Sequence, residues 1–515
     1  MRLIALCGLL AVASPVSLCE RRNPTVCSLD PGFECTDGKF CSIATGESTG
    51  KCVQAECTTA NNTCSSDHPI CLSGRCVPCQ GNQDCQSLNN PDAPICSAGK
   101  CVGCASNVDC TVQTEPICDS VSHTCRACQT HGDCSSVASV CAKDDTFANL
   151  STTDQSLNIP KGSCVPASKI NVVDPSCAAS TCSLATELAL VSVQRPYVRV
   201  GSVNTTNTVT IPPLPTPPVP TFYIVGPTAD FAPSRTIPVA PASITPPGTG
   251  LSIPAGSHTI IEGMVLNQSN VGLDCVGGAQ TKVKLIRSLV AQCATGIKAG
   301  PRCELSIDSS WIGKGPPDPR LSVYGANAVA MQLNSTQLEV VNSVFFHNGG
   351  GSGVFGGVSL SDSMGLNPLV RFINTTFDNH IFADATRKTL AVDCNYMTNG
   401  KVTFLNTLFL NPSAPGALFT YVNSNCRQGA NPIASIGSNE AGLSCPSCVT
   451  NVDESIFVDA SLGDLHLKST APTSITAGGT TQFTDSVGQV PVPAADIDGV
   501  ARGASAAIGA FNPSP

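Results

Sequence analysis

Short stretches in which apolar and polar residues alternate recur through the C-terminal two thirds of this chain. Each stretch ends in a small polar residue, as in Met264-Val265-Leu266-Asn267 and Arg371-Phe372-Ile373-Asn374. A polar residue recurs in this way at positions 267, 287, 308, 342, 374 and 406, in steps of 20, 21, 34, 32 and 32 residues. Short strands at such a period are typical of a solenoid, in which each coil stacks on the one before.

The recurring asparagine indicates how the coils turn their corners. Asparagine tolerates the left-handed backbone region that a tight corner requires, and its amide can bond to the coils above and below. We therefore expect Asn342, Asn374 and Asn406 to form a ladder along one corner. The longer steps of the later coils predict inserted loops, where a functional surface would lie.

The solenoid is expected to begin before its first clear coil. Leu184, Leu188 and Val191 would share one face of a short helix, and such a helix would cover the open end of the solenoid. Two strands are predicted after this helix, at 195–200 and 207–211.

The proline-rich segment 212–247 allows two interpretations. It could be a flexible linker, because proline interrupts regular structure. However, Phe222-Tyr223-Ile224-Val225-Gly226 inside it has the pattern of a strand. We therefore favour a long turn between two early coils.

Cysteines mark a separate N-terminal arm. The chain has 31 cysteines, and 24 of them lie before residue 183, a density that indicates disulfides in an exported chain. Five sets of four repeat at intervals of about 25 residues, the mark of a modular array. The sets are Cys27, Cys35, Cys41 and Cys52; Cys57, Cys64, Cys71 and Cys76; Cys79, Cys85, Cys96 and Cys101; Cys104, Cys110, Cys118 and Cys125; and Cys128, Cys134, Cys141 and Cys164. Units this short cannot bury a sufficient core, so we expect two disulfides within each unit, with three connectivities open.

The residues around the cysteines repeat as well. Asn82-Gln83-Asp84-Cys85, Asn107-Val108-Asp109-Cys110 and His131-Gly132-Asp133-Cys134 occupy the same place in successive units. These units resemble the short Asp-Cys-containing cysteine repeats of bacterial secreted proteins, a resemblance that implies no particular function. The arm is either a stalk without a specific partner or an adhesive surface, and we favour the stalk.

Four Cys-x-x-Cys pairs raise the question of zinc. They are Cys76/Cys79, Cys101/Cys104, Cys125/Cys128 and Cys445/Cys448. Almost no histidine lies near them, and an oxidising compartment favours disulfides over thiolate ligands. We predict no metal site and no cofactor.

The first residues have the pattern of an export signal. Arg2 precedes an apolar stretch from Leu3 to Ala13, which is too short to span a bilayer. We predict that residues 1–18 form this signal and that no later segment spans a membrane. Cys19 either carries a lipid, as in a bacterial lipobox, or remains after ordinary signal removal and pairs in a disulfide. The protein is expected outside the cell or at its outer surface.

The charge of the chain argues against two kinds of partner. The net charge of −9 and the pI near 5.2 disfavour nucleic acid and anionic membranes. Charged residues make up only 13% of the chain and aromatic residues 4%, while Gly, Pro, Ser, Thr, Val and Asn are abundant, a composition that favours β-structure with many turns.

The C-terminal tail carries a specific motif. Its parts are Phe457-Val458-Asp459, Gly463-Asp464-Leu465-His466-Leu467, Ala471-Pro472, Asp496-Ile497-Asp498-Gly499, Arg502 and Ile508-Gly509-Ala510-Phe511, preceded by Ser435-Ile436-Gly437-Ser438-Asn439. This tail resembles the C-terminal signature of bacterial choice-of-anchor Q proteins in the pectin-lyase-like superfamily. The resemblance implies an all-β fold, a right-handed parallel β-helix, on a cell-surface or secreted protein. We divide the chain into a cysteine-rich arm at 19–164, the β-helix with its capping helix at 165–470, and a C-terminal cap at 471–515.

Enzymes of the pectin-lyase-like superfamily cleave acidic polysaccharides. They use clustered aspartates that bind calcium, a lysine or arginine base, or a pair of aspartates for hydrolysis. The candidate constellation in this chain is Arg371, Asp378, His380, Asp384, Arg387 and Lys388. Asp378, His380 and Lys388 are the candidate catalytic residues, and calcium would be a cofactor only in such an enzyme. We favour the simpler interpretation, a solvated surface loop.

Three further residues have alternative roles. Trp311 could stack on a sugar ring, although packing is the more frequent role of a single tryptophan. His347 is expected in a turn. Nine cysteines lie beyond the five repeats, so either Cys19 pairs with one of them or one remains a buried free thiol, for which Cys293 is the candidate.

The sequence therefore favours a non-enzymatic extracellular protein that displays a β-helix on a disulfide-rich stalk. Its partner would be a polysaccharide or another component of the cell envelope. The alternative is a diverged polysaccharide lyase or hydrolase, and a purely structural role is a third hypothesis.

Overall fold

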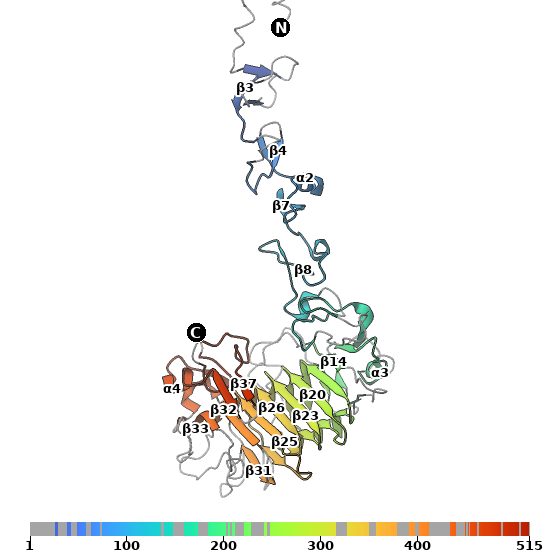
Figure 1. The fold of residues 1–515 in the computed structure, drawn as a ribbon, viewed down its shortest axis with the longest axis vertical. Coiled ribbons are helices and arrows are strands. Elements are labelled where there is room, and N and C mark those ends of the chain that lie inside the picture. Colours follow the sequence, from blue (N-terminus) through green and yellow to red (C-terminus); the bar gives the residue numbers. More distant parts are fainter. Residues whose placement is uncertain are drawn as a thin grey trace, which may run out of the picture. The chain divides into compact units, whose positions relative to one another are not determined.

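The computed structural model describes most of the chain. The described residues are 26–28, 35, 39–42, 49–57, 63–72, 75–134, 139–147, 159–173, 184–201, 204–205, 209–211, 221–227, 242–244, 248–315, 327–349, 357–378, 391–396, 401–410, 433–438, 449, 452, 454–460, 463–485, 488–503 and 506–513. Contacts within the chain form two compact units, Met1–Ala127 and Cys128–Pro515 (Figure 1). Within the described ranges, no helix is both long and apolar enough to cross a membrane.

The first unit consists of small antiparallel sheets. A three-stranded sheet with the order β1-β3-β2 is followed by three two-stranded hairpins, and short helical turns lie between the hairpins. The elements are β1 (Val26–Ser28), β2 (Lys39–Ser42), β3 (Thr49–Gln54), β4 (Ile70–Leu72), β5 (Arg75–Val77), α2 (Asn82–Gln86), β6 (Ile95–Ser97), β7 (Lys100–Val102), η1 (Asn107–Asp109), β8 (Ile117–Cys118) and β9 (Cys125–Arg126).

Disulfides within each repeat replace a hydrophobic core. The first cysteine of a set pairs with the third, and the second pairs with the fourth. The bonds are Cys35–Cys52, Cys57–Cys71, Cys64–Cys76, Cys79–Cys96, Cys85–Cys101, Cys104–Cys118, Cys110–Cys125, Cys128–Cys141 and Cys134–Cys164. The predicted pairing within each unit is confirmed for these bonds, and the structure selects one of the three connectivities. In the chain-entropy model, a bond that closes a loop of about 15 residues contributes about 3 kcal/mol.

The repeated Asn-x-Asp-Cys motif organises the turn that opens each unit. The Asp84 carboxylate accepts hydrogen bonds from two backbone N–H groups of the preceding turn. The side-chain oxygen of Asn82 accepts the N–H of Cys96 at 2.9 Å. Asp109 and Asn107 make the equivalent bonds in the next unit. The motif thus ties the first turn of a unit to its hairpin.

The second unit is a right-handed parallel β-helix whose strands form three faces, and every pairing between coils is parallel. Face 1 contains β10 (Ile170–Val173), β11 (Tyr197–Val200), β14 (Thr221–Val225), β17 (His258–Glu262), β20 (Thr281–Ile286), β23 (Cys303–Asp308), β26 (Gln337–Val341), β29 (Leu369–Ile373) and the first half of β32 (Lys401–Leu410). Face 2 contains β12 (Asn204–Thr205), β15 (Ala242–Ile244), β18 (Met264–Asn267), β21 (Leu289–Ala291), β24 (Trp311–Gly313), β27 (Val344–Phe346), β30 (Thr376–Asp378) and the second half of β32. Face 3 contains β13 (Val209–Thr210), β16 (Thr249–Ile253), β19 (Val271–Cys275), β22 (Thr295–Ala299), β25 (Val329–Asn334), β28 (Val358–Ser361) and β31 (Val392–Tyr396). β33 (Ile433–Ser438) pairs with β32 (Figure 1).

Apolar side chains fill the inside of the coils. In β23, Leu305 and Ile307 are buried, and the alternate residues Glu304, Ser306 and Asp308 face outward, as the alternating sequence predicts. Phenylalanine rings of successive coils stack along the axis. Their centres are 4.6 Å apart for Phe345 and Phe377 and 5.0 Å apart for Phe377 and Phe409.

One left-handed residue joins face 1 to face 2 in each coil from β17 to β32. These residues are Gly263, Arg287, Ser309, Asn342, Asn374 and Asn406, with φ between 43° and 68°. Each of the first five donates its backbone N–H to the residue that precedes the corner in the next coil; the N–H of Asn342 lies 3.0 Å from the Ile373 carbonyl oxygen. The three predicted asparagine corners are confirmed. The Asn406 amide donates to Asn374 at 3.4 Å, whereas the Asn342 amide donates to the Ala495 carbonyl oxygen at 2.8 Å.

The recurrence of polar residues also predicts corners at positions 267 and 308, and there it is wrong. Asn267 is the last residue of β18, and the left-handed residue after it, Gln268, stands at the following corner of the coil. Asp308 ends β23, and Ser309 occupies the corner. A strand that ends in polar residues precedes two corners of each coil, so spacing alone cannot distinguish them.

The early coils agree with the sequence. α3 (Leu184–Ala189) buries Leu184 and Leu188, as predicted. β14 pairs with β11 on one side and β17 on the other, so the strand predicted inside the proline-rich segment belongs to a coil. This supports the interpretation of the segment as part of the β-helix.

The fifth cysteine unit covers the N-terminal end of face 1. It contains η2 (His131–Asp133) and precedes η4 (Ala167–Lys169). Its apolar residues and the outward side chains of face 1 form one buried cluster: Val140, Ala142, Phe147, Ile159, Val165, Ile170, Tyr197, Tyr223, Val225, Ile260 and Ile286. The Tyr197 hydroxyl also donates to the Phe147 carbonyl oxygen at 2.6 Å.

A buried carboxylate fixes this contact. Glu262 is fully buried, and its carboxylate accepts bonds from His131 Nε2 at 2.9 Å, from Lys143 at 2.8 Å and from Arg287. His131 Nδ1 accepts the N–H of Cys141 at 2.9 Å, so the ring hydrogen is on Nε2. Burial raises the pKa of Glu262, but Arg287, Lys143 and His131 outweigh this effect, and the pKa lies well below its usual value.

The C-terminal segment covers face 2. Its elements are η6 (Glu454–Ile456), β34 (Phe457–Asp459), β35 (Asp464–Leu467) and α4 (Thr473–Thr476), followed by the hairpin of β36 (Gln482–Asp485) and β37 (Gly488–Pro491). Their apolar residues pack on outward side chains of face 2 such as Trp311 and Phe346. The hairpin lies instead on the C-terminal end of face 1, where Val490 packs with Ile373 and Leu405.

The units seen in the structure differ from the predicted segments at two boundaries. The compact unit begins at Cys128, whereas the sequence analysis ended the arm at residue 164. Residues before 471 also pack on face 2, among them Val452, Ile456 and Phe457. The packing of the fifth cysteine unit on face 1 and of residues 452–457 on face 2 depends on tertiary structure. The spacing of cysteines or strands therefore does not indicate either contact.

Replacing Asn374 should separate the two contributions of a corner asparagine. Its side chain donates to the Ala507 carbonyl oxygen at 3.0 Å and its φ is 49°. Asn374→Gly should destabilise the protein through the lost hydrogen bonds, and Asn374→Ala should cost about 1–2 kcal/mol more because alanine resists the left-handed conformation. Urea unfolding followed by the fluorescence of Trp311, the single tryptophan, measures both values. If Asn374→Gly and Asn374→Ala were equally stable, the left-handed backbone at residue 374 would not be a source of strain for alanine.

Replacing His131 should weaken the contact between the fifth unit and face 1. His131→Asn keeps the acceptor for Cys141, as in Asn82 and Asn107, but loses the bond to Glu262. We expect a loss of about 1–3 kcal/mol in the free energy of unfolding. The reverse change in the arm, Asn107→His, is the control and should stay within about 0.5 kcal/mol. Equal effects of the two variants would refute this role of His131.

Candidate functional site

An uncovered polar strip lies in the middle of face 1. Its outward residues form three rows that run along the axis of the β-helix. The entrance row is Lys282, Glu304 and Gln337; the middle row is Lys284, Ser306, Glu339 and Arg371; and the corner row is Ile286, Asp308, Val341 and Ile373. Neighbouring residues of a row stand on adjacent coils, about 4.8 Å apart.

Both ends of the corner row are closed. Ile286 is buried under the fifth cysteine unit, and Ile373 is buried under the hairpin of β36 and β37. In the corner row, Asp308 alone is polar, and it is half-buried. In the entrance row, Lys282 and Glu304 each keep 44% of their side-chain surface exposed. The strip is therefore open at the entrance row and narrow at the corner row.

The charges of the strip are largely paired. Lys282 and Glu304 form an ion pair at 2.9 Å, and Arg371 lies 3.4 Å from Glu339. Because the partners occupy the same row on adjacent strands, register holds each pair in place. Such pairs at a surface add little stability, so their value lies in presenting charged donors and acceptors at fixed positions.

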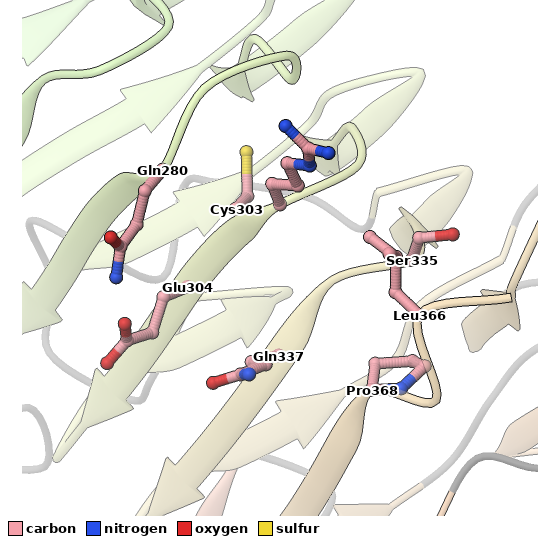
Figure 2. A pocket seen from close by; sticks show the side chains of 8 residues that line it. Gln280, Cys303, Glu304, Ser335, Gln337, Leu366 and Pro368 are labelled. Carbon is pink, nitrogen blue, oxygen red and sulfur yellow. The ribbon is translucent and has the colours of Figure 1, made fainter. Parts of the chain in front are cut away.

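A pocket of about 380 Å³ lies beside the entrance row, at the corner between face 3 and face 1. Figure 2 shows Gln280, Glu304 and Gln337 on one side of it and Leu366 and Pro368 on the other. The remaining lining residues are Arg302, Cys303 and Ser335. Among the described residues, the side chains of Gln280, Arg302 and Gln337 have no hydrogen-bond partner. A pocket of this size with free polar groups and an apolar wall suits part of a small ligand.

The predicted constellation is only partly described. Arg371 lies in the middle row of the strip, whereas Asp378 ends β30 on face 2 and is fully buried. His380, Asp384, Arg387 and Lys388 lie outside the described residues, as does Cys19. The candidate catalytic residues Asp378, His380 and Lys388 therefore remain predictions.

Trp311 and His347 have structural surroundings. Trp311 is fully buried, with its ring centre 5.8 Å from that of Phe346 and 6.3 Å from that of Phe511. The packing role is therefore confirmed. His347 stands at the corner after β27, as expected, and burial lowers its pKa to about 4, with Lys314 contributing.

The cysteines of the β-helix behave as the sequence indicated. Cys293 is a buried free thiol, and burial raises its pKa to about 11. Cys275 and Cys303 form a disulfide between adjacent coils. The groups of three cysteine sulfurs that lie close enough to share a metal are sulfurs of the disulfides given above, and oxidised sulfur is not a thiolate ligand.

The residues of the C-terminal motif close the corner between faces 1 and 2. Arg502 donates to Asn342 at 3.0 Å and to the carbonyl oxygens of Gly509 and Ala510. The imidazole of His466 lies between two carboxylates, with Nδ1 2.6 Å from Asp464 and Nε2 2.7 Å from Asp498. Because these carboxylates contact opposite ring nitrogens, the group is a structural clamp and cannot form one metal site.

The three series of parallel strands define a parallel β-helix protein with disulfide-rich repeats before it. No family model matches the chain, and no curated protein matches it. One similar solved structure is described as the crystal structure of pectate lyase Pel9A. It has 16% sequence identity, the match covers 67% of this chain and 96% of that chain, and the TM-score is 0.31. A likeness at this level adds nothing to the fold given by the strand pairings, and the resemblance to choice-of-anchor Q proteins stays a prediction.

Most of the strip was not predicted from the sequence. Nothing in the sequence sets Lys282, Lys284, Glu304, Asp308 and Glu339 apart, because they lie in strands and belong to no recognised catalytic motif. The feature of the sequence that could have indicated the strip is the alternation within these strands, in which charged residues occupy the outward positions. In other strands the outward positions are covered, so the pattern alone does not mark a site.

The stability of the C-terminal cap should depend on pH. The hydrogen bond to Asp498 raises the pKa of His466 to about 9; burial opposes the shift and Asp464 supports it. The protonated ring stabilises the folded state fully below pH about 6.5, and this contribution is lost as pH rises through about 9. Thermal unfolding between pH 6 and 10 should show the loss, and His466→Gln should remove that part of the pH dependence. An unchanged pH profile in the variant would contradict the clamp.

Proposed function

We propose that this protein is an extracellular, non-enzymatic glycan-binding protein whose binding surface is the central strip of face 1. One observation carries the proposal. Towards both ends of the β-helix, outward side chains of face 1 are buried under other segments, whereas between them Lys282, Glu304 and Glu339 keep 44%, 44% and 39% of their side-chain surface exposed. Carboxylates, amides and cationic groups at fixed spacing can exchange several hydrogen bonds with the hydroxyl groups of a glycan.

The cysteine repeats support an extracellular location. Disulfides persist in oxidising environments, and every repeat unit in the described part of the arm contains at least one. A chain of small stapled units needs no partner to remain folded, which suits a stalk that holds the β-helix away from its point of attachment.

The enzyme alternative has one feature in its favour. Glu304 and Glu339 are diagonal neighbours on adjacent strands, at a separation of about 7–8 Å, within the range that inverting glycosidases use. Both carboxylates, however, form ion pairs with Lys282 and Arg371, an arrangement that suits the binding of hydroxyl groups. We therefore favour binding, and the experiment below includes a measurement of cleavage.

Blocking the strip should abolish glycan binding. Ser306 stands in the middle row and faces outward, and Ser359 is an outward serine in β28 on face 3. Ser306→Trp should remove retention of the full chain, with its disulfides formed, on a panel of immobilised polysaccharides, because the indole fills the strip. Ser359→Trp is the matched control and should be retained like the unchanged protein.

Release of new chain ends is measured in the same samples. New ends that disappear in Ser306→Trp would establish an enzyme with its site in the strip. Equal retention of both variants would place any binding surface elsewhere. No retention of the unchanged protein on any polysaccharide would leave a structural role as the better account.

A further inference from the structure

Around its corner row, the strip is bounded by covered regions on three sides. The fifth cysteine unit covers Ile286 and the hairpin of β36 and β37 covers Ile373, so two walls stand across the axis of the β-helix. Two strands, β23 and β26, lie between the covered residues of β20 and β29, a width of about 10 Å. A long polymer cannot run along the axis over the corner row. A ligand must instead cross the strands, from the entrance row towards the corner row.

The third wall stands behind the corner row. The corner residue Asn342 bonds to Ala495 and Arg502 of the C-terminal segment, and Arg287 is engaged with Glu262. Between them lies Ser309, followed by Trp311, which is buried against Phe511. Beyond this corner the C-terminal segment covers face 2, so a chain that enters over the entrance row meets that segment here. The side chain there is Asp308, whose carboxylate accepts the Ser309 hydroxyl at 2.9 Å.

The charge balance of the strip indicates the class of ligand. The charges of the ion pairs Lys282–Glu304 and Arg371–Glu339 cancel, and the charge of Lys284, which donates to the Thr146 hydroxyl, offsets that of Asp308 on the adjacent strand. Arg302, at the rim of the pocket, is the remaining cation, in a chain of net charge −9. Binding of a polyanion requires an excess of several cations, and the strip and its pocket provide an excess of one. Paired carboxylates and cationic groups can instead accept and donate hydrogen bonds to neighbouring hydroxyl groups of a neutral sugar.

We propose that the strip binds the end of a neutral oligosaccharide or polysaccharide chain, with the terminal sugar at Asp308 and the following sugars over the middle and entrance rows. This inference rests on the proposed glycan-binding function and adds the orientation and the class of the ligand. The pocket at Gln280, Arg302 and Leu366 then lies beside the sugars nearest the opening.

The test compares glycans that differ in charge, length and chain ends. The full chain is titrated with cello-, laminari-, manno- and galacto-oligosaccharides of increasing length, with polygalacturonate as the acidic comparison. Members of the best series are then tested with the reducing end reduced to an alditol, or with the non-reducing end blocked as an acetal. We expect a neutral series to bind, affinity to stop increasing once the strip is full, and one of the two end modifications to abolish binding.

Two variants connect this result to the proposed residue. Asp308→Asn should weaken binding about tenfold, because hydrogen bonds to a charged group are lost. Asp274→Asn is the matched control: Asp274 faces outward on face 3, beside Lys298, and its replacement should leave affinity unchanged. Thermal unfolding verifies that both variants fold, and Glu339→Gln gives a second test within the strip.

The outcomes distinguish the inference from the function on which it rests. Binding that tolerates modification of both ends would overturn chain-end recognition and leave glycan binding intact. A preference for polygalacturonate would overturn the neutral class. Binding that responds equally to Asp308→Asn and Asp274→Asn would overturn the placement of the terminal sugar. No binding of any glycan would overturn the proposed function itself.

Discussion

The register in which one coil stacks on the next is the constraint on which the rest of this molecule depends. Each strand must pair its backbone groups with the coils on both sides, so every coil must turn its corner at the same place. The left-handed residues from Gly263 to Asn406 meet this requirement. Once the register is fixed, side chains of successive coils fall into rows, and each row is buried or exposed according to what covers it. The aromatic stack inside the coils and the ion pairs outside them are two consequences of the same register.

What covers each face decides where function can lie. The C-terminal segment closes face 2, and the fifth cysteine unit and the last hairpin close the two ends of face 1. In the remaining part of face 1, charged side chains lie at the surface. A β-helix exposes a long surface by its nature, and here the added segments reduce one face to a short strip with three walls. This enclosure gives the strip a defined shape, which the uncovered face of a solenoid does not have.

The fifth cysteine unit shows how a repeat becomes part of another fold. His131 replaces the asparagine of the earlier units and keeps its hydrogen bond to the backbone, while its second nitrogen reaches Glu262. A carboxylate that is fully buried needs several donors, and His131, Lys143 and Arg287 supply them from both sides of the contact. A single change in a repeated motif thus accompanies the transition from a unit of the arm to a cap of the β-helix.

The sequence by itself determined the parallel coils, the corner asparagines Asn342, Asn374 and Asn406, the pairing of cysteines within units and the free thiol of Cys293, because alternation, left-handed backbone and cysteine spacing are local signals. It misplaced the corners at 267 and 308, since two corners of a coil share one pattern. It did not reveal the strip around Ser306 and Glu339, because a polar outward residue has the same sequence pattern whether it is covered or open. Only the tertiary structure decided this, through packing between segments as distant as Phe147, Tyr223 and Val490.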